Sequence, residues 1–274
     1  LLGEDVVGAD RARQIRGFNY DDMQLFSVFY ALKGDPEFAS AKYDSEVQRS
    51  WLGYCGGESL SEIRNAQAGA VSGALPDEVM AGWFIPTRAD PSQAPPGCHT
   101  AYGWMNVPPC PRRWRGRQLD GWDSWRHIGE PLADAVTELF EKHAPGFKDL
   151  VLERFVGTPL DAEHNNPSAV LGNIMGGSPM PEQYGVNRPL PGICVGGASR
   201  SFIPGLYLSN SIHPYGATHL ASGYIAAHEV AEDLGCREAA WWKAKPFVWF
   251  LENMFNVPMN AGVPKKWQRG TGGA

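Results

Sequence analysis

The stretch Ser201–Glu229 reads SFIPGLYLSNSIHPYGATHLASGYIAAHE. Its first apolar run, Gly205–Leu208, is bounded by turn residues and predicts a short buried strand. A polar loop, Ser209–Pro214, follows, and small residues then open a segment with helical apolar spacing. A strand that turns through small residues into a helix leaves unpaired backbone N–H groups at the helix start, where the helix dipole also favours negative charge. An ordinary strand–helix turn explains the spacing equally well.

Residues from both halves of this stretch match one known signature. The matching residues are Gly205, Leu206, Tyr207, Leu208, His213, Pro214, Gly216, Gly223, Ala226 and Ala227. In this respect the chain resembles the phytoene desaturase-like flavoenzymes, within the superfamily of FAD-dependent amine oxidases and carotenoid desaturases. Asn210, Tyr215 and Ala217 stand where that family usually has glycines. Tyr215 could narrow the cleft or stack near a flavin, which argues against a long polyene as the substrate.

A second segment carries an independent match. Residues 86–100 read PTRADPSQAPPGCHT and resemble the family segment P-S-x-x-D-P-S-x-A-P-P-G-x-H-T. From the residues alone, the segment predicts a rigid proline-rich turn between two strands, at Ala81–Ile85 and Ala101–Val107. With weaker matches elsewhere, the resemblance covers roughly residues 1–235.

The composition is that of a globular protein. The 274 residues are 43% hydrophobic and 20% charged, with a net charge of -6. This balance argues against a nucleic-acid-binding protein, which normally carries a basic face. One local exception is the cluster Arg112, Arg113, Arg115 and Arg117 around Trp114. It is expected to be a solvated loop, or alternatively a contact for a partner or an anionic group.

The cysteines and the apolar runs further limit the class of protein to which this chain can belong. The five cysteines are scattered without a C-x-x-C pair, which argues against a disulfide framework or a zinc site and fits a reducing compartment. No apolar run approaches the roughly 20 residues of a membrane span. We therefore expect no metal and a cytoplasmic location, with peripheral membrane contact as an alternative.

The expected fold class is α/β (α+β), with a mixed or antiparallel sheet and helices in a substrate-binding domain and a strand–helix return of a Rossmann-like FAD domain. Gln24–Leu32 predicts a buried strand, and a further strand is expected at Val151–Val156. Residues 1–16 are expected to form a turn and a short helix, and further helices are expected over residues 59–70 and 131–143. Their expected N-terminal signals are Asp10 as a cap, a capping box of Ser59 and Glu62, and Pro131 in the first turn.

The domain boundaries follow from the resemblance. Residues 1–195 are expected to bind substrate, and residues 196–235 to form the strand–loop–helix return. Residues 236–274 include an aromatic tail that we expect to form an interface with another chain, to pack on the chain's own core or to contact a membrane.

The sequence contains no G-x-G-x-x-G dinucleotide fingerprint. Since the matched signature belongs to the part of the family that closes over FAD, we expect this chain to supply only the C-terminal part. The Rossmann half would then come from a separate chain, a cleaved partner or a further portion of a longer protein.

The resemblance also implies a site. FAD is expected to contact Ser209, Asn210, Gly216, Ala217, Thr218, His219, Leu220 and Ala221. The helix start here would stabilise the anionic reduced flavin. His213 would fix the loop or contact the flavin, His219 is a candidate general base, and Tyr215 is a third candidate catalytic residue. Asn210, Tyr184 and Tyr215 could orient an oxygen atom of the substrate.

The expected function is hydride removal from a largely apolar small molecule, with a cyclic or isoprenoid skeleton as an option, giving a C=C or C=O bond. The chain would be part of an FAD-dependent desaturase or dehydrogenase, since the flavin carries the difficult chemistry. Two alternatives are an FAD-dependent isomerase or hydratase of the same fold, and a non-catalytic scaffold subunit.

Overall fold

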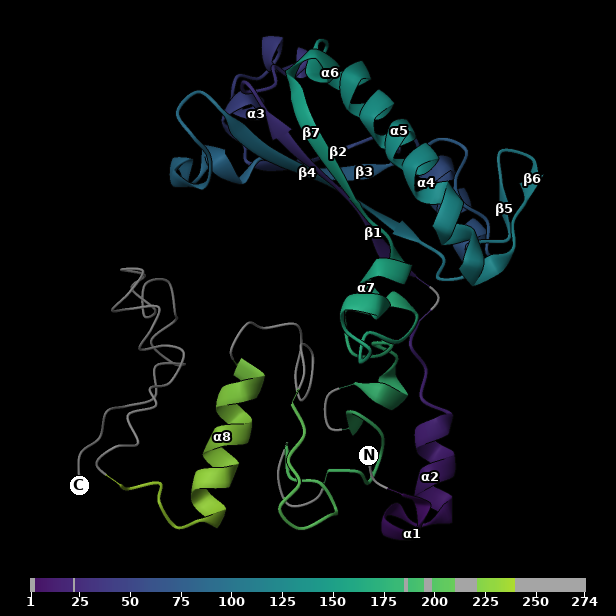
Figure 1. Ribbon diagram of the computed structural model, residues 1–274, viewed down its shortest axis with the longest axis vertical. Helices are drawn as coiled ribbons and strands as arrows, with labels where there is room; N and C mark the ends of the chain where they lie inside the picture. Colours follow the sequence, from purple (N-terminus) through teal and green to yellow (C-terminus); the bar gives the residue numbers. More distant parts are fainter. Residues whose placement is uncertain (1–2, 22, 185–186, 195–198, 210–220, 240–274) are drawn as a thin grey trace, which may run out of the picture. The chain divides into compact units, whose positions relative to one another are not determined.

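The computed structural model describes residues 3–21, 23–184, 187–194, 199–209 and 221–239 (Figure 1). Its contacts divide the chain into two compact units, and each is described by itself. The larger unit comprises residues 17–179, and the smaller comprises residues 1–16 together with 180–274. The functional boundaries expected from the sequence, 1–195, 196–235 and 236–274, stay predictions.

A five-stranded antiparallel sheet forms the centre of the larger unit. In sheet order, its strands are β2 (Leu52–Cys55), β3 (Ala81–Phe84), β4 (His99–Val107), β1 (Gln24–Leu32) and β7 (Val151–Gly157). Every neighbouring pair is antiparallel. Helices and an antiparallel sheet in one chain confirm the predicted mixed fold class.

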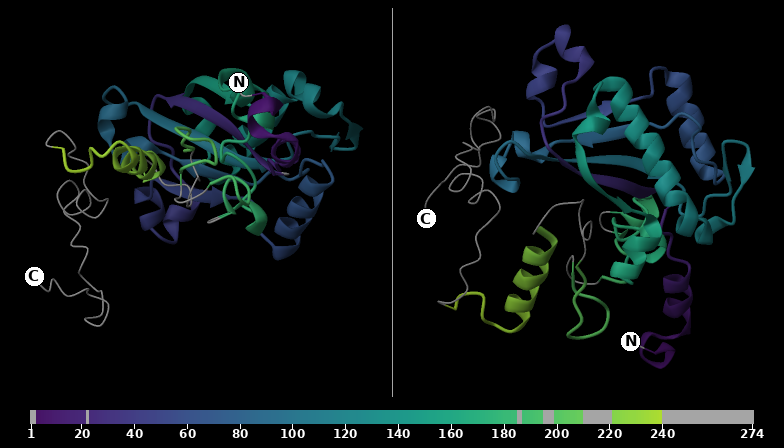
Figure 2. Two further views of the ribbon diagram at one scale, coloured as in Figure 1. Left: turned by 90° about the horizontal axis from the view of Figure 1, so that it is seen from below. Right: turned by 45° about the horizontal axis from the view of Figure 1, so that its top comes forward.

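The remaining elements of this unit connect or cover the strands, as Figure 2 shows. They are η1 (Ala39–Lys42), α3 (Glu46–Arg49), α4 (Leu60–Val71), η2 (Pro86–Arg88), η3 (Pro91–Gln93), β5 (Arg113–Trp114), β6 (Arg117–Gln118), η4 (Gly121–Ser124), α5 (Trp125–His143), α6 (Phe147–Leu150), α7 (Pro159–Asn165) and η5 (Val170–Gly172). Among the described residues, no helix is long and apolar enough to cross a membrane.

Strand β1 has the predicted bounds, and its burial is confined to one face. Phe26, Val28, Tyr30 and Leu32 are buried, whereas Phe29 between them is 41% exposed. Successive side chains of a strand point to opposite faces. The sheet therefore has one face in the hydrophobic core and one face that carries exposed side chains.

Helix α5 covers the buried face of the sheet. Leu132, Val136 and Phe140 are buried at a spacing of four residues, the repeat that places side chains on one side of a helix. Phe140 contacts Tyr30 edge to face, with ring centroids 6.0 Å apart. The hydroxyl of Tyr30 lies 3.0 Å from Thr137 Oγ1, and burial raises the pKa of Tyr30 to about 12.

The N-terminus of α5 differs from its prediction. The helix begins at Trp125, so Pro131 lies inside it and not in its first turn. Tertiary contacts stabilise the helical turns that precede Pro131. Trp125 and Ile128 are buried, and the indole N–H of Trp125 donates to Pro109 O at 2.7 Å. These contacts offset the loss of one helical hydrogen bond at the proline.

The caps of two other helices also refine the predictions. Ser59 caps α4 as predicted, because its hydroxyl accepts from Glu62 N at 3.2 Å. The Glu62 carboxylate, however, accepts from Glu58 N and does not complete the capping box with Ser59 N. Asp10 is not a cap: it lies in the first turn of α2 (Ala9–Arg16), where it pairs with Arg13.

Arg88 joins three segments of the larger unit. Its side chain is 5% exposed and donates to Asp35 Oδ1 (2.9 Å), Ser50 O (2.8 Å) and Pro36 O (2.8 Å). A buried guanidinium is tolerated only when its donors are satisfied. Arg88 therefore anchors the proline-rich segment 86–100 to the loops before η1 and β2.

We expect Arg88→Ala to lower the free energy of unfolding by about 3 kcal/mol, because it removes the side-chain donor to Ser50 O and leaves Pro36 O and the Asp35 carboxylate with Gln48 as their remaining side-chain donor. Denaturant unfolding checks this value. The matched control is Arg49→Ala, which removes an exposed ion pair with Glu46 and should cost under about 0.5 kcal/mol. Equal effects of the two substitutions would contradict the anchoring role.

The smaller unit contains α1 (Glu4–Val7), α2, η6 (Pro181–Gln183) and α8 (Ala221–Asp233). The predicted buried strand Gly205–Leu208 is not a regular strand. It forms a single bridge, between Arg200 and Tyr207, and its apolar residues are partly exposed. Gly205, at φ 79°, reverses the chain, and Ser201 N donates to Leu206 O across the turn. The tight reversal pairs the run with the residues just before it, in place of a longer sheet.

Candidate functional site

Most of the site residues expected from the sequence lie outside the described residues. These are Asn210, His213, Tyr215, Gly216, Ala217, Thr218, His219 and Leu220. Ser209 is exposed after the turn at Gly205, and Ala221 is the first residue of α8. Tyr184 is described and is 44% exposed. The assignment of these residues to a flavin site stays a prediction.

Polar contacts connect the two described segments on either side of that region. Glu229 on α8 is buried, and its carboxylate accepts from Ser199 N (3.0 Å) and Arg200 N (2.7 Å). Arg200 Nε donates to both carboxylate oxygens of Asp233, and Tyr207 donates its hydroxyl hydrogen to Asp233. Helix α8 is thereby held against the turn that precedes the predicted loop.

The same contacts stabilise the ionised form of Asp233. Hydrogen bonds from Arg200 and then Tyr207 hold the pKa of Asp233 below its usual value. The Asp233 carboxylate in turn raises the pKa of Tyr207. A carboxyl whose pKa is lowered on folding stabilises the fold above its unfolded pKa, and that stabilisation is lost as the pH falls through the folded pKa.

We expect Asp233→Asn to increase amide hydrogen exchange in α8 and at Ser199 and Arg200 at neutral pH. The difference from the unchanged protein should shrink as the pH falls below about 4, where the unfolded carboxyl takes up a proton, and should disappear below the lowered pKa of the folded Asp233. The control is Asp10→Asn, which affects an exposed pair with Arg13. A difference that persists unchanged to low pH would show that the charge of Asp233 is not the cause.

The exposed face of the large sheet carries a continuous group of rings. We call it the aromatic sheet face and define it by Phe29, Phe84, Tyr102, Trp104 and Phe155. Phe84 stacks on Tyr102 with centroids 4.6 Å apart, and Trp104 lies 4.8 Å from Phe84. Phe29 continues the group at 5.7 Å from Tyr102 and 6.1 Å from Phe155, which is 64% exposed. Exposed rings in contact with one another indicate a binding surface.

An apolar pocket of about 450 Å³ adjoins this face. Leu25 of β1, Tyr54 of β2 and Trp104 of β4 line it from the sheet, and Ile63 and Ala66 line it from α4. Its volume falls in the range of sites for small molecules. Because Trp104 belongs to both features, the aromatic sheet face continues into the pocket.

Glycines keep part of this pocket open. A Cβ on Gly57, which has φ 68°, would lie 2.7 Å from Met80 Sδ. A Cβ on Gly82 would lie 3.3 Å from ring atoms of both Phe84 and Tyr54. Larger residues at these two positions would displace the side chains that shape the pocket wall.

Sequence reasoning missed the aromatic sheet face, although a signal for it exists. Tyr102 and Trp104 alternate with the buried residues Ala101, Gly103 and Met105 along β4. This period of two marks one face of a strand. The rings of β1, β3, β4 and β7 meet because these strands pair with one another. The sequence of a single strand does not show which strands it pairs with.

The chemistry of the described residues limits what they can hold. They contain no group of three or more His, Cys, Asp or Glu side chains arranged to bind a metal ion. The aromatic sheet face presents rings, whereas the diphosphate of FAD requires N–H donors or cations. This face therefore fits an apolar molecule and not a diphosphate.

Comparison with known proteins supports the oxidoreductase class. No family model matches the chain. Curated proteins to which it is similar are nevertheless named as an oxidoreductase domain protein and as part of a dehydrogenase. The narrower prediction, a phytoene desaturase-like flavoprotein, stays a prediction.

Pyridine nucleotide-disulfide oxidoreductase domain-containing protein 2 of Mus musculus is 36% identical over 167 residues, which are 59% of this chain and 26% of that protein. Its counterpart in Rattus norvegicus is 36% identical over 166 residues, with the same shares. A subunit of the limonene dehydrogenase of Castellaniella defragrans is 25% identical over 233 residues, 83% of this chain and 40% of that protein. The chain thus spans between about a quarter and two fifths of the length of these relatives.

Proposed function

We propose that this chain is the substrate-binding part of an FAD-dependent oxidoreductase that removes hydride from a largely apolar, cyclic or isoprenoid, small molecule. The observation that carries the proposal is the aromatic sheet face and its continuation into the apolar pocket. Similarity to an oxidoreductase domain protein and to a dehydrogenase subunit supports the reaction class.

The rings would bind such a substrate by burial and by contact between flat surfaces. Trp104 would contact the part of the substrate that enters the pocket, and Phe29 and Phe155 would contact the part that remains on the sheet. Covering these rings with substrate would also exclude water from the reacting carbon. This arrangement favours a compact or flat hydrocarbon skeleton over a charged metabolite.

FAD, when bound, would supply the acceptor for the hydride. Formation of a C=C bond releases a proton from the neighbouring carbon, and a C=O bond releases one from a hydroxyl. We propose His219 as the base that takes this proton, with His213 and Tyr215 fixing the loop or the substrate. The proposed flavin contacts are Ser209, Asn210, Gly216–Leu220 and Ala221.

A partner for the flavin is part of the proposal. The sequence lacks the dinucleotide fingerprint, and one relative is named as a subunit of a dehydrogenase. We propose that the Rossmann half belongs to another chain or to another portion of the same protein. A membrane surface, reached through the aromatic residues after position 236, would give access to lipid-soluble substrates.

The test is purification of the native assembly, followed by mass spectrometry, visible absorbance and anaerobic mixing with a cyclic monoterpene and a linear isoprenoid alcohol. We expect a flavin spectrum that bleaches with one of these substrates and an oxidised product. Product formation without consumption of an electron acceptor would identify the isomerase or hydratase alternative. An assembly without flavin would favour the scaffold alternative.

We expect Trp104→Leu to raise KM for the apolar substrate roughly five- to tenfold, because it removes a ring shared by the aromatic sheet face and the pocket. Steady-state kinetics of the assembly measure the change. The control is Tyr43→Leu, which removes an exposed ring that lies outside this face. If both variants keep the original KM, the substrate does not lie on the aromatic sheet face.

Filling the pocket should discriminate between substrates by size. Ala66→Phe places a ring in the pocket from α4, so we expect kcat/KM to fall on the order of tenfold for the largest accepted substrate and less for smaller ones. Ala68→Phe adds the same ring to an exposed position of α4 that does not line the pocket. The two variants should show clearly different substrate profiles, and identical profiles would exclude the pocket as a substrate site.

A further inference from the structure

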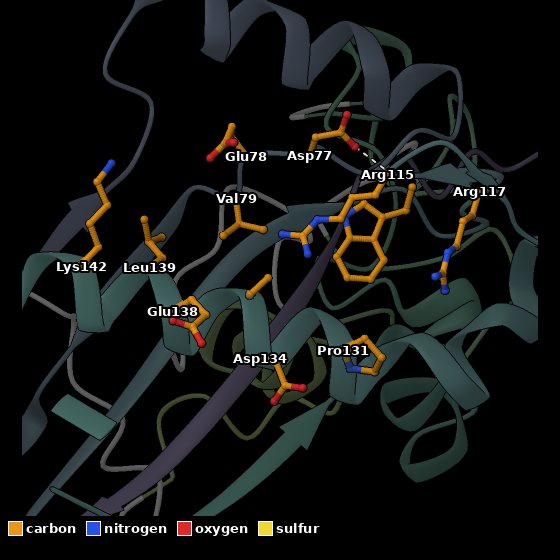
Figure 3. Close-up of a pocket in the computed structure, with 12 residues that line it drawn as sticks. Asp77, Glu78, Val79, Arg115, Arg117, Pro131, Asp134, Glu138, Leu139 and Lys142 are labelled. Carbon is orange, nitrogen blue, oxygen red and sulfur yellow. Dashed lines mark hydrogen bonds between the residues drawn. The ribbon is translucent and has the colours of Figure 1, made fainter. Parts of the chain in front are cut away.

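A groove elsewhere on the larger unit has a different chemistry. It lies between α5 and the β5–β6 hairpin, has a volume of about 590 Å³, and shares no residue with the aromatic sheet face or the apolar pocket (Figure 3). Its floor consists of the buried residues Val79, Trp114, Ala135 and Leu139. We call this feature the charged groove, because charged residues of both signs form its rim.

The acidic residues that α5 contributes to the charged groove, Asp134 and Glu138, are largely neutralised by the protein itself. Asp134 pairs with Arg154 at 2.8 Å, and Glu138 pairs with Lys148. The third charged residue of α5 in the groove, Lys142, pairs with Glu58 at 3.0 Å. Charges already matched in this way contribute little to the attraction of a ligand.

The opposite wall carries more positive than negative charge: Asp77 and Glu78 line it, but Arg115 and Arg117 line it too, and Arg112 and Arg113 flank them. Arg115 and Arg117 project into the groove from the hairpin, as Figure 3 shows, and make no ion pair with any described residue. Arg112 and Arg113 flank them, are exposed, and also lack an ion pair within the described ranges. The carboxylate of Asp77 accepts from the backbone N–H of Arg115, so it holds the turn and does not pair with the guanidinium.

The backbone of Arg115 is unusual for an arginine. Arg115 and Gly116 form a two-residue hairpin loop with φ values of 46° and 74°. Such loops favour Asn, Asp and Gly, because other side chains are strained at positive φ. The Arg115 guanidinium lies 4.9 Å from the ring centroid of Trp114, which orients it while leaving its N–H donors available. A strained residue whose side chain is held in this way points to a function beyond turn formation.

We propose that the charged groove docks an acidic peptide segment of a partner protein, with carboxylates on Arg115 and Arg117 and small apolar side chains over the floor. Guanidinium groups bind carboxylates in two-point contacts, and a surface with an apolar centre and a polar rim is typical of a protein interface. The proposal concerns an attachment site and is independent of the substrate and the cofactor.

The experiment measures binding of a fluorescein-labelled Glu-Leu repeat peptide to the full chain by fluorescence anisotropy, with Lys-Leu and Gln-Leu peptides as comparisons. We expect the acidic peptide to bind most tightly and to weaken as ionic strength rises from about 0.05 to about 0.5 M. Arg115→Asn should weaken it at least about threefold, and Arg115→Asn with Arg117→Gln on the order of tenfold.

The Arg115→Asn variant also separates binding from folding. Asn tolerates positive φ better than Arg, so the midpoint of thermal unfolding should not fall. The matched control is Arg64→Gln with Arg126→Gln, which removes the same charge from exposed positions outside the groove and should preserve binding. Equal binding of acidic and basic peptides, or unchanged binding in the double groove variant, would overturn the proposal. Displacement by succinate at equal carboxylate concentration would overturn it too, since it would indicate a small-anion site.

Discussion

The register between β1 and β4 is the constraint on which both faces of the large sheet depend. It pairs Val28 with Gly103 and Phe29 with Tyr102. A shift of one residue would exchange the two faces of a strand, because side chains alternate with a period of two residues. In the observed register, Val28 enters the core beneath α5 while Phe29 joins the rings on the exposed face. One set of backbone hydrogen bonds thereby creates both the hydrophobic core and the aromatic sheet face.

The two faces are packed in different ways. On the core face, Gly103 allows α5 to approach closely, since a Cβ there would lie 2.9 Å from the ring of Phe140. The aromatic sheet face has rings that contact one another but remain exposed, and α4 adds the wall of a pocket at one end. Burial of the core face under α5 stabilises the sheet. The aromatic sheet face is not covered in this way, so its apolar area remains accessible to a ligand. This division would suit the substrate-binding role that we propose for this chain.

The proline-rich segment that resembles the flavoenzyme family has a structural explanation in this chain. Arg88 fixes it to two other loops, Asp90 accepts from Ser92 N, and Thr87 lies 2.9 Å from His99 at the start of β4. The segment therefore sets the path of the chain from β3 into β4, next to the rings of the aromatic sheet face. The family-like sequence of this segment therefore has an explanation in the fold itself, because it positions the start of β4.

Several local elements could be predicted from the sequence alone. Strand β1 has the predicted bounds, and β3, β4 and β7 lie within a residue or two of their predicted positions. Ser59 caps α4 as predicted. These features depend on propensity, capping and short-range periodicity, all of which operate between near neighbours in the chain. Long-range packing settled which side of β1 is exposed, why α5 continues through Pro131, and how Trp104 comes to line a pocket with Ala66. It also placed Arg115 and Arg117 opposite α5. Each of these outcomes depends on contacts between residues far apart in the chain. A local sequence pattern cannot indicate the energies of such contacts.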